Sequence, residues 1–143
     1  MSVKIMLADK GNDIYSVQNT AKLREAIALL NEKNIGAVLV TDSAGKLAGI
    51  LSERDIVRRS LMQETGFRDE LVTKSMTEKV FTVTSGASLD DVMAVMTNSK
   101  IRHVPVLDGD EIKGVISIGD VVKRKIAIAE SEAAMMRDYI SAG

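Results

Sequence analysis

Two seven-residue stretches decide how the chain is organised: Gly49-Ile-Leu-Ser-Glu-Arg-Asp55 and Gly114-Val-Ile-Ser-Ile-Gly-Asp120. Each has a glycine, then two branched apolar residues, then serine, and aspartate three positions after the serine. The apolar residues are typical of a buried strand, and Ser-x-x-Asp is typical of the first turn of a helix. We therefore expect each stretch to be a junction at which a strand passes directly into a helix.

The two junctions lie in two copies of one longer unit. With an offset of 66 the matching pairs are Val17 and Val83, Ala21 and Ala87, Leu23 and Leu89, Ile35 and Ile101, Val38 and Val104, Val40 and Val106, and Asp42 and Asp108. A one-residue deletion then lowers the offset to 65, which aligns Gly49, Ser52, Asp55 and Arg59 with Gly114, Ser117, Asp120 and Arg124. Two copies are too few for a solenoid, which needs about three. A pseudo-twofold pair is expected, in which each unit buries its apolar face against the other.

Each unit is expected to fold in the order β-α-β-β-α. The expected strands are residues 14–17, 36–41 and 47–51 in the first unit and 80–83, 102–107 and 112–117 in the second. The first helix of each unit has apolar residues at helical spacing, which are Leu23, Ala26, Ile27 and Leu30, then Leu89, Val92, Met93 and Met96. The closing helices are expected over residues 53–62 and 119–128, and a further amphipathic helix over 129–140.

These elements predict a mixed α/β (α+β) fold of two repeats packed sheet to sheet, with a C-terminal helix. We assign the first repeat to residues 4–62, a connector to 63–75, the second repeat to 76–128 and a C-terminal helical tail to 129–143. One repeat-to-repeat interface then brings both strand-to-helix junctions to the same seam.

Composition excludes several kinds of site. The chain has no cysteine and a single histidine, which excludes disulfides, thiol catalysis and multi-histidine metal sites. A net charge of −1 and only 3% aromatic residues argue against nucleic-acid binding. With no apolar run near 18 residues and no signal-peptide pattern, we expect no membrane contact and a cytoplasmic location. No phosphate loop and no nucleophile with a base is visible, so the chain is not expected to be an enzyme.

Ser-x-x-Asp has two interpretations, which are compatible. In the first it is only a capping box, in which Asp55 and Asp120 bond back to a free backbone N–H and complement the helix dipole. In the second the helix N-terminus also binds an anion, and the second carboxylate oxygen accepts hydrogen bonds from a ribose cis-diol.

Arg102 and His103 open a strand of the second unit, where the first unit has Gly36 and Ala37. Because the first unit is expected to form the same strand without cations, the strand itself does not require them. Arginine offers a planar set of donors that suits phosphate, and histidine can donate beside it. The alternative is a partly buried histidine beside a solvated arginine, and the sequence leaves both interpretations open.

The repeated β-α-β-β-α order with Gly-h-h-Ser-x-x-Asp resembles paired cystathionine-β-synthase (CBS) domains, or the Bateman module. The resemblance covers residues 4–128 and is closest in two stretches, Ile35-Gly-Ala-Val-Leu-Val and Ile101-Arg-His-Val-Pro-Val, each with its junction. The sequence is similar to those of small stand-alone CBS-pair proteins. The resemblance implies clefts between the repeats that bind AMP, ADP or ATP, or else NAD or S-adenosylmethionine, with Mg²⁺ present only through a bound nucleotide.

The resemblance also assigns residues to two clefts. The better cleft comprises Asp120 on the ribose, Ser117 beside it, Arg102 and His103 on phosphate, and an adenine wall of Ala21, Ala26 and Ile35. The second cleft comprises Asp55 and Ser52, with Ala87, Val92 and Ile101 against the base and Arg54 as a substitute cation. Gly36 and Ala37 supply no side-chain cation to the second cleft, so we expect the Asp120 cleft to be the main site.

The resemblance implies a regulatory module that senses energy or redox state and acts on a partner protein or on its own oligomer. A homodimer is expected, with Ile56, Val57, Val121 and Val122 as its exposed apolar face. The alternative is a structural or interaction module whose Ser-x-x-Asp motifs only cap helices. Nucleic-acid binding through the basic helix ends is a third, less favoured possibility.

Overall fold

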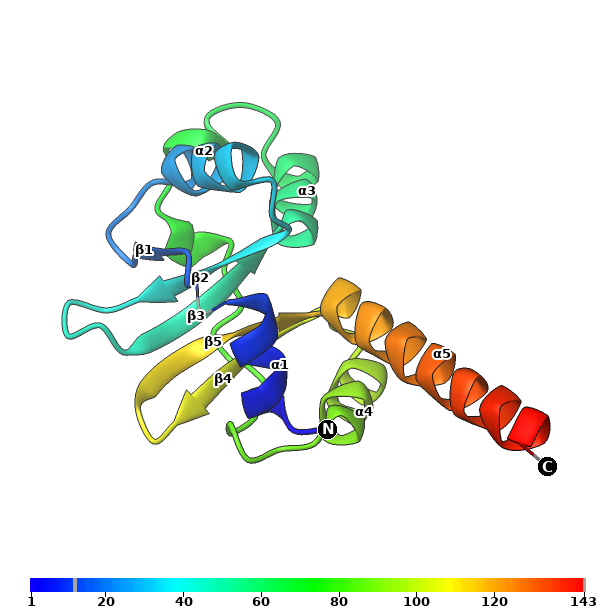
Figure 1. Ribbon diagram of the computed structural model, residues 1–143. Coiled ribbons are helices and arrows are strands. Elements are labelled where there is room, and N and C mark those ends of the chain that lie inside the picture. Colours follow the sequence, from blue (N-terminus) through cyan, green and yellow to red (C-terminus); the bar gives the residue numbers. More distant parts are fainter. Residues whose placement is uncertain (12, 143) are drawn as a thin grey trace.

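The computed structural model describes residues 1–11 and 13–142 and confirms the mixed α/β fold (Figure 1). The first repeat contains β1 (Ser16–Gln18), α2 (Leu23–Lys33), β2 (Ala37–Thr41), β3 (Leu47–Ser52) and α3 (Glu53–Met62). The second contains α4 (Leu89–Ser99), β4 (His103–Asp108), β5 (Glu111–Ser117) and α5 (Ile118–Ala142). A helix α1 (Val3–Lys10) precedes them, and two short 3₁₀ turns, Phe67–Asp69 and Val72–Lys74, lie in the connector.

The sheets are short and differ between the repeats. In the first, β1 pairs in parallel with β2, and β2 pairs antiparallel with β3. In the second, β4 and β5 form an antiparallel pair, and the strand predicted over 80–83 is reduced to a bridge between Val83 and Val106. Pro105 explains the difference, because Leu39 at the same place in the first repeat donates its N–H to the Tyr15 carbonyl. Proline has no N–H to donate, so the outer strand of the second repeat loses that bond.

Each repeat has its own apolar core. In the first, Leu23, Ala26, Leu30, Val38, Val40, Leu51 and Val72 are buried together. In the second, the buried cluster comprises Leu89, Val92, Met96, Val104, Val106, Ile116 and Val121, together with Val3, Met6 and Leu7 of α1. The N-terminal helix therefore packs in the core of the second repeat, although it comes first in the chain.

Helix α1 was not predicted from the sequence. It has eight residues and is capped by Ser2, whose hydroxyl accepts a hydrogen bond from the Ile5 N–H at 3.4 Å. Backbone bonds from Val3 to the Ala87 carbonyl (2.8 Å) and from Leu89 to the Met1 carbonyl (3.0 Å) join it to the second repeat. A helix this short depends on tertiary packing, and its packing partners lie more than 80 residues away, where local periodicity carries no signal.

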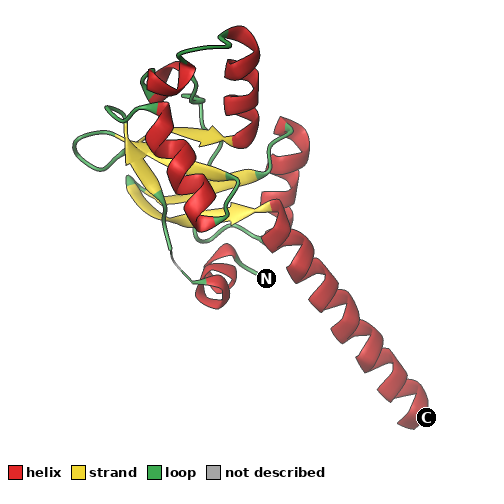
Figure 2. Cartoon of the chain, turned by 90° about the horizontal axis from the view of Figure 1, so that it is seen from above, coloured by secondary structure: helices red, strands yellow, loops and turns green. Residues whose placement is uncertain are grey.

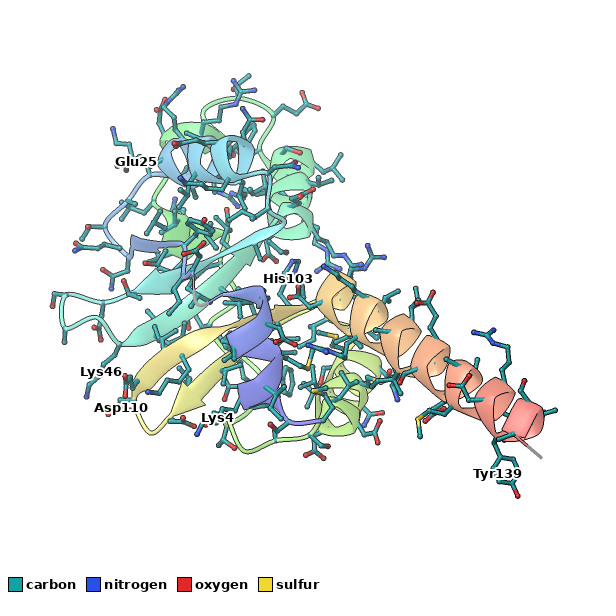
Figure 3. All side chains as sticks on the ribbon, in the orientation of Figure 1. Lys4, Glu25, Lys46, His103, Asp110 and Tyr139 are labelled. Carbon is teal, nitrogen blue, oxygen red and sulfur yellow. The ribbon has the colours of Figure 1, made fainter. Side chains whose placement is uncertain are left out.

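The two sheets lie against one another between two groups of helices, as Figures 1 and 2 show. Side chains alternate between the faces of a strand, so Leu39 and Pro105 point away from their own repeats' cores. Both are nevertheless fully buried, and we infer that each repeat covers this second face of the other. At the hairpin tips Lys46 forms an exposed ion pair with Asp110 at 3.4 Å (Figure 3).

Helix α5 is continuous, where the sequence predicted one helix to 128 and another from 129. No glycine or proline interrupts residues 120–142, and alanine, glutamate and methionine there favour helix. The predicted dimer face needs one correction, because Val121 is buried (2% exposed) in the second core. Ile56 is half-buried against the first core, whereas Val57 and Val122 are exposed.

The first glycine of each junction is required by close approach of another segment. A Cβ at Gly49 would lie 2.9 Å from the Thr77 carbonyl oxygen and 2.7 Å from Met76 Sδ. A Cβ at Gly114 would lie 2.7 Å from Leu7 Cδ2, the movable end of a side chain. The Met76–Thr77 segment, just after the connector, thus crosses one strand at Gly49, and helix α1 crosses the other at the equivalent place, Gly114.

Gly49→Ala is expected to lower the free energy of unfolding by about 1–3 kcal/mol, because the Thr77 backbone must shift. Gly114→Ala should cost less, since the Leu7 side chain can turn. Gly86→Ala is the control, because its Cβ would have only an ordinary contact at 3.9 Å. Urea unfolding of the three variants measures the order of their stabilities. A Gly49→Ala protein that is as stable as Gly86→Ala would contradict the prediction.

Candidate functional site

Both strand-to-helix junctions form the capping boxes expected from the sequence. The Ser52 N–H donates to Asp55 Oδ2 at 2.9 Å, and the Asp55 N–H donates to Ser52 Oγ at 3.3 Å. In the second repeat the equivalent distances, between Ser117 and Asp120, are 2.8 and 3.2 Å. The capping interpretation is therefore correct for both. It leaves Oδ1 of each aspartate for another partner.

Asp120 has a partner that sequence reasoning missed. Lys10 Nζ, at the end of α1, donates to Asp120 Oδ2 and to the Val115 carbonyl, both at 2.7 Å. The Lys10 and Asp120 side chains are 33% and 25% exposed. Burial acts to raise the pKa of Asp120, but the Lys10 ammonium and the Ser117 N–H outweigh it and hold that pKa below its ordinary value. The carboxylate is thus charged and partly shielded, and no bond to its Oδ1 is found among the described residues.

Asp55 is held at the equivalent place by Thr77, which lies just after the connector. The Thr77 hydroxyl donates to Asp55 Oδ1 at 3.4 Å, and the Thr77 backbone pairs with Ile50 in both directions, at 2.8 and 3.0 Å. Ile50 corresponds to Val115, so Thr77 and Lys10 occupy corresponding positions in the two repeats. Their chemistry differs, because a neutral hydroxyl covers one carboxylate and an ammonium covers the other.

His103 lies at the seam between the repeats, at the start of β4 (Figure 3). A Cβ on Gly36 would lie 3.1 Å from the His103 ring and 3.4 Å from Glu53 Oε1, so the imidazole fits against the first repeat. Burial lowers the pKa of His103, and Lys10 and Arg102 lower it further, against the opposing effect of Glu53 and Asp120. Arg102 is exposed beside it, and its carbonyl accepts the Ile118 N–H at 2.8 Å.

A hollow of about 260 Å³ opens beside Asp120. It is lined by Met6, Asp9, Lys10, Asp120, Lys123, Arg124 and Ala127. Lys10, Lys123 and Arg124 give it three cations against two carboxylates, although Arg124 pairs with Asp9. Of the residues expected in the better cleft, only Asp120 lines this hollow.

Two residues of the predicted adenine walls are buried. Ala26 and Val92 have no exposed surface, because each faces the core of its own repeat. Ala21 and Ile35 in one wall, and Ala87 and Ile101 in the other, are half-buried at the edges of those cores. Arg54 is exposed on the first turn of α3. The half-buried residues remain candidates.

Lys10 and Thr77 were missed because neither lies in a recognisable motif. Glu53 lies inside the first junction, Gly49–Asp55, but was passed over because it is neither the serine nor the aspartate of Ser-x-x-Asp. The one sequence signal for Lys10 and Thr77 is that each comes a few residues before the first expected strand of its repeat. Within the described residues, no group of three or more His, Asp or Glu side chains could hold a metal ion. None of the helices in residues 1–11 and 13–142 is long and apolar enough to span a bilayer.

The CBS domain family matches this chain twice, over residues 8–62 and 69–126. The chain belongs to the CBS domain family. The mitochondrial CBS domain-containing protein CBSX3 of Arabidopsis thaliana is 33% identical over 123 residues, which are 83% of this chain and 60% of CBSX3. This CBS pair thus spans less than two thirds of that relative's length.

Solved structures share the CBS-pair fold. The CBS-domain containing protein ATU1752 of Agrobacterium tumefaciens matches with a TM-score of 0.84 and 38% identity, over 87% of this chain and 99% of that one. The CBS domain protein PAE2072 of Pyrobaculum aerophilum, complexed with AMP, matches with a TM-score of 0.75 and 25% identity, over 84% and 89% of the two chains. The resemblance inferred from the duplicated junctions is confirmed.

Lys10→Gln is expected to lower the free energy of unfolding at pH 7 by roughly 0.5–1 kcal/mol, since the ion pair with Asp120 is partly exposed. The pKa of Asp120 is lower in the folded chain than its unfolded value of about 4. The pair's contribution is therefore present above that value and is lost as the pH falls through the folded pKa.

The difference in the free energy of unfolding between Lys10→Gln and the unsubstituted chain should thus become smaller as the pH is lowered from 7 toward 3. Urea unfolding at several pH values measures it. Lys123→Gln removes a charge from the same hollow and forms no ion pair among the described residues, so it is the control. A Lys10→Gln effect that does not depend on pH would argue against the ion pair.

Proposed function

We propose that the chain is a regulatory CBS-pair module that binds an adenine nucleotide at the Asp120 cleft. The observation that carries this is the state of Asp120, a charged carboxylate at a helix N-terminus with one oxygen in the cap and the other open. Such an oxygen can accept a ribose hydroxyl. The cations in the adjoining hollow favour an anionic ligand.

The ligand's parts meet groups of matching chemistry. One ribose hydroxyl donates to Oδ1 of Asp120, and the second shares Oδ2 with Lys10 and Ser117. Arg102 and His103 are the groups for phosphate, and the half-buried Ala21 and Ile35 are candidates for the base. The structure of PAE2072 with AMP supports the adenosine class, as does that of the CBS domain pair of MJ0100 with 5′-methylthioadenosine and S-adenosylmethionine, which matches with a TM-score of 0.78 and 25% identity. ADP, ATP, NAD and accompanying Mg²⁺ rest on the family resemblance alone.

The Asp55 cleft is the weaker site in this proposal. Its carboxylate already receives the Thr77 hydroxyl on the oxygen that Asp120 leaves open. Gly36 and Ala37 stand where the other repeat has Arg102 and His103, so a phosphate there has only Arg54 nearby in sequence. One nucleotide per chain is therefore expected at moderate ligand concentration.

The module is proposed to act by ligand-dependent arrangement of its repeats rather than by catalysis. Both repeats contribute to the seam at which His103 and Asp120 lie, so a ligand bound there changes the free energy of one arrangement relative to another. A partner protein, or a second copy in a homodimer, reads that arrangement. The rival proposal is a structural module in which Ser-x-x-Asp only caps helices.

Thermal unfolding with AMP, ADP, ATP, NAD, S-adenosylmethionine and GMP, each with and without Mg²⁺, tests the proposal. A ligand at about 100 times its Kd stabilises by roughly 2.7 kcal/mol, which raises Tm by several degrees for a chain of this size. Adenine nucleotides are expected to raise Tm, and GMP is not. Nucleotide retained through purification is checked first, by denaturing the protein and assaying the supernatant.

The matched variants are Asp120→Ala and Asp91→Ala. Asp91 forms the same capping box with Ser88 at the start of α4, with distances of 2.9 and 3.0 Å. Both variants should lose about 1 kcal/mol of stability with the cap, and Asp120→Ala should lose roughly 0.5–1 kcal/mol more because it also removes the ion pair with Lys10. Only Asp120→Ala should lose AMP affinity, at least tenfold or about 1.4 kcal/mol, and 2′-deoxy-AMP should bind the unsubstituted chain more weakly than AMP. Equal AMP binding by the two variants would support the structural module instead.

AMP affinity is expected to rise as the pH falls from 8 to 6.5. Free His103 has a pKa below its ordinary value, and a bound phosphate favours the charged imidazolium, so binding takes up a proton between the two pKa values. His103→Gln should flatten the profile. Adenosine is the control ligand, because it has no phosphate and its affinity should not change over this range. If the AMP affinity of the His103→Gln variant still depends on pH in the same way, His103 does not contact the phosphate.

A further inference from the structure

The second half of α5 projects beyond the rest of the molecule (Figure 2). Apolar side chains remain uncovered along it, with Ile126 53%, Met136 60% and Ile140 69% exposed. Tyr139, at its far end, is 78% exposed and points into solvent (Figure 3). A helix with this much uncovered apolar surface is incomplete as an isolated structure.

Six of the exposed apolar residues follow a heptad spacing, whereas Met135 and Tyr139, which are also exposed, lie beside it. A stripe is formed by Val122, Ile126, Ala129, Ala133, Met136 and Ile140, whose spacings are 4, 3, 4, 3 and 4. This is the period of a left-handed coiled coil, with Ile126, Ala133 and Ile140 at a positions and the other three at d. Isoleucine at two of the three a positions is a residue that parallel dimers use there, although they combine it with leucine at d, which this stripe lacks. The central alanines permit close approach.

Charges beside the stripe select a partner. In a parallel pair a g residue faces the e residue of the next heptad on the other helix. Lys125 and Glu132 are at g, and Glu130 and Arg137 are at e. The stripe of a second copy, in register, therefore places Lys125 opposite Glu130 and Glu132 opposite Arg137, each twice by symmetry. Lys125 also forms an ion pair with Asp90 of its own chain at 3.2 Å, so the Glu132–Arg137 pairs contribute most to the selection.

The antiparallel alternative has the opposite charge pattern. There g faces g and e faces e, so full overlap of two stripes sets Glu132 against Glu132 and Glu130 against Glu130. It also sets Lys123 against Arg137. Like charges facing one another disfavour this arrangement.

The stripe continues onto the body of the protein. Val122, Ile126 and Ala129 also line an open apolar groove of about 370 Å³ between α4 and α5, with Met93, Met96 and Ile118. Just under three heptads is short for an isolated coiled coil. The groove extends the same uncovered surface, so two copies joined along α5 also approach there.

We propose that α5 pairs with α5 of a second copy as a parallel, in-register two-stranded coiled coil over residues 122–140. The pairing is independent of nucleotide binding, so it stands or fails separately from the proposed function. It fixes the two CBS pairs of the dimer side by side at the same end of the coil.

Disulfide formation between single-cysteine variants tests the register, since the chain has no cysteine of its own. Ala129→Cys and Met136→Cys place the thiol at two d positions, and Ser131→Cys places it on the outer face. In the full chain under mild oxidation, the first two variants should form covalent dimers and the third should not. In an antiparallel pair, two copies of the same residue lie close together only where the twofold axis crosses the helices. Such a pair would therefore form a disulfide at one d position at most.

Cross-linking at only one d position, or no preference over Ser131→Cys, would overturn the proposal. A charge exchange provides the second arm. Glu132→Arg and Arg137→Glu should each weaken dimerisation roughly tenfold in analytical ultracentrifugation, because each creates like-charge pairs twice. The double variant should restore it. Single variants that leave the dimerisation constant unchanged, or a double variant that does not recover, would also overturn the proposal.

Discussion

Burial of the two sheets against one another is the constraint on which the rest of this structure depends. Leu39 and Pro105 are fully buried on the strand faces that point away from their own repeats' helices. The helices of a repeat cover only one face of its sheet, so a repeat alone would leave Leu39 or Pro105 exposed to water. The repeats must therefore fold as a pair. The segment before each repeat is shared between them as well, since α1 completes the core of the second repeat and Val72 of the connector completes that of the first.

This sharing explains the composition of Gly-h-h-Ser-x-x-Asp. The glycine allows another segment to cross the strand, as Thr77 does at Gly49 and Leu7 does at Gly114. The apolar residues bury the strand, and the serine and aspartate cap the helix. Every residue of the motif thus serves the fold, and of the two aspartates only Asp120 has a second oxygen left for a ligand among the described residues. The motif therefore identifies the fold with more certainty than it identifies a binding site.

What the sequence could predict was local. The capping boxes, the amphipathic helices and the strand order depend on residues within a few positions of one another, and all were predicted. Helix α1, the Lys10 ion pair with Asp120 and the shortened outer strand at Val83 were not, because each depends on a partner distant in the sequence. The family resemblance assigned Ala26 and Val92 to ligand walls by position, but helical periodicity turns both toward the cores. Their inclusion in the predicted apolar faces was itself a sign of that burial.

The differences between the repeats are coupled rather than independent. Gly36 is where the first repeat lacks the cation that the second has, and the His103 ring lies 3.1 Å from where a Cβ of residue 36 would be. A larger side chain at 36 would press on that ring, so the loss of a cation in one repeat makes room for the imidazole of the other. The seam holds one such ring, flanked by Glu53 from the first repeat and by Asp120 and Lys10 on the other side. Duplication created two equivalent junctions, and packing across a single seam has made their electrostatics unequal.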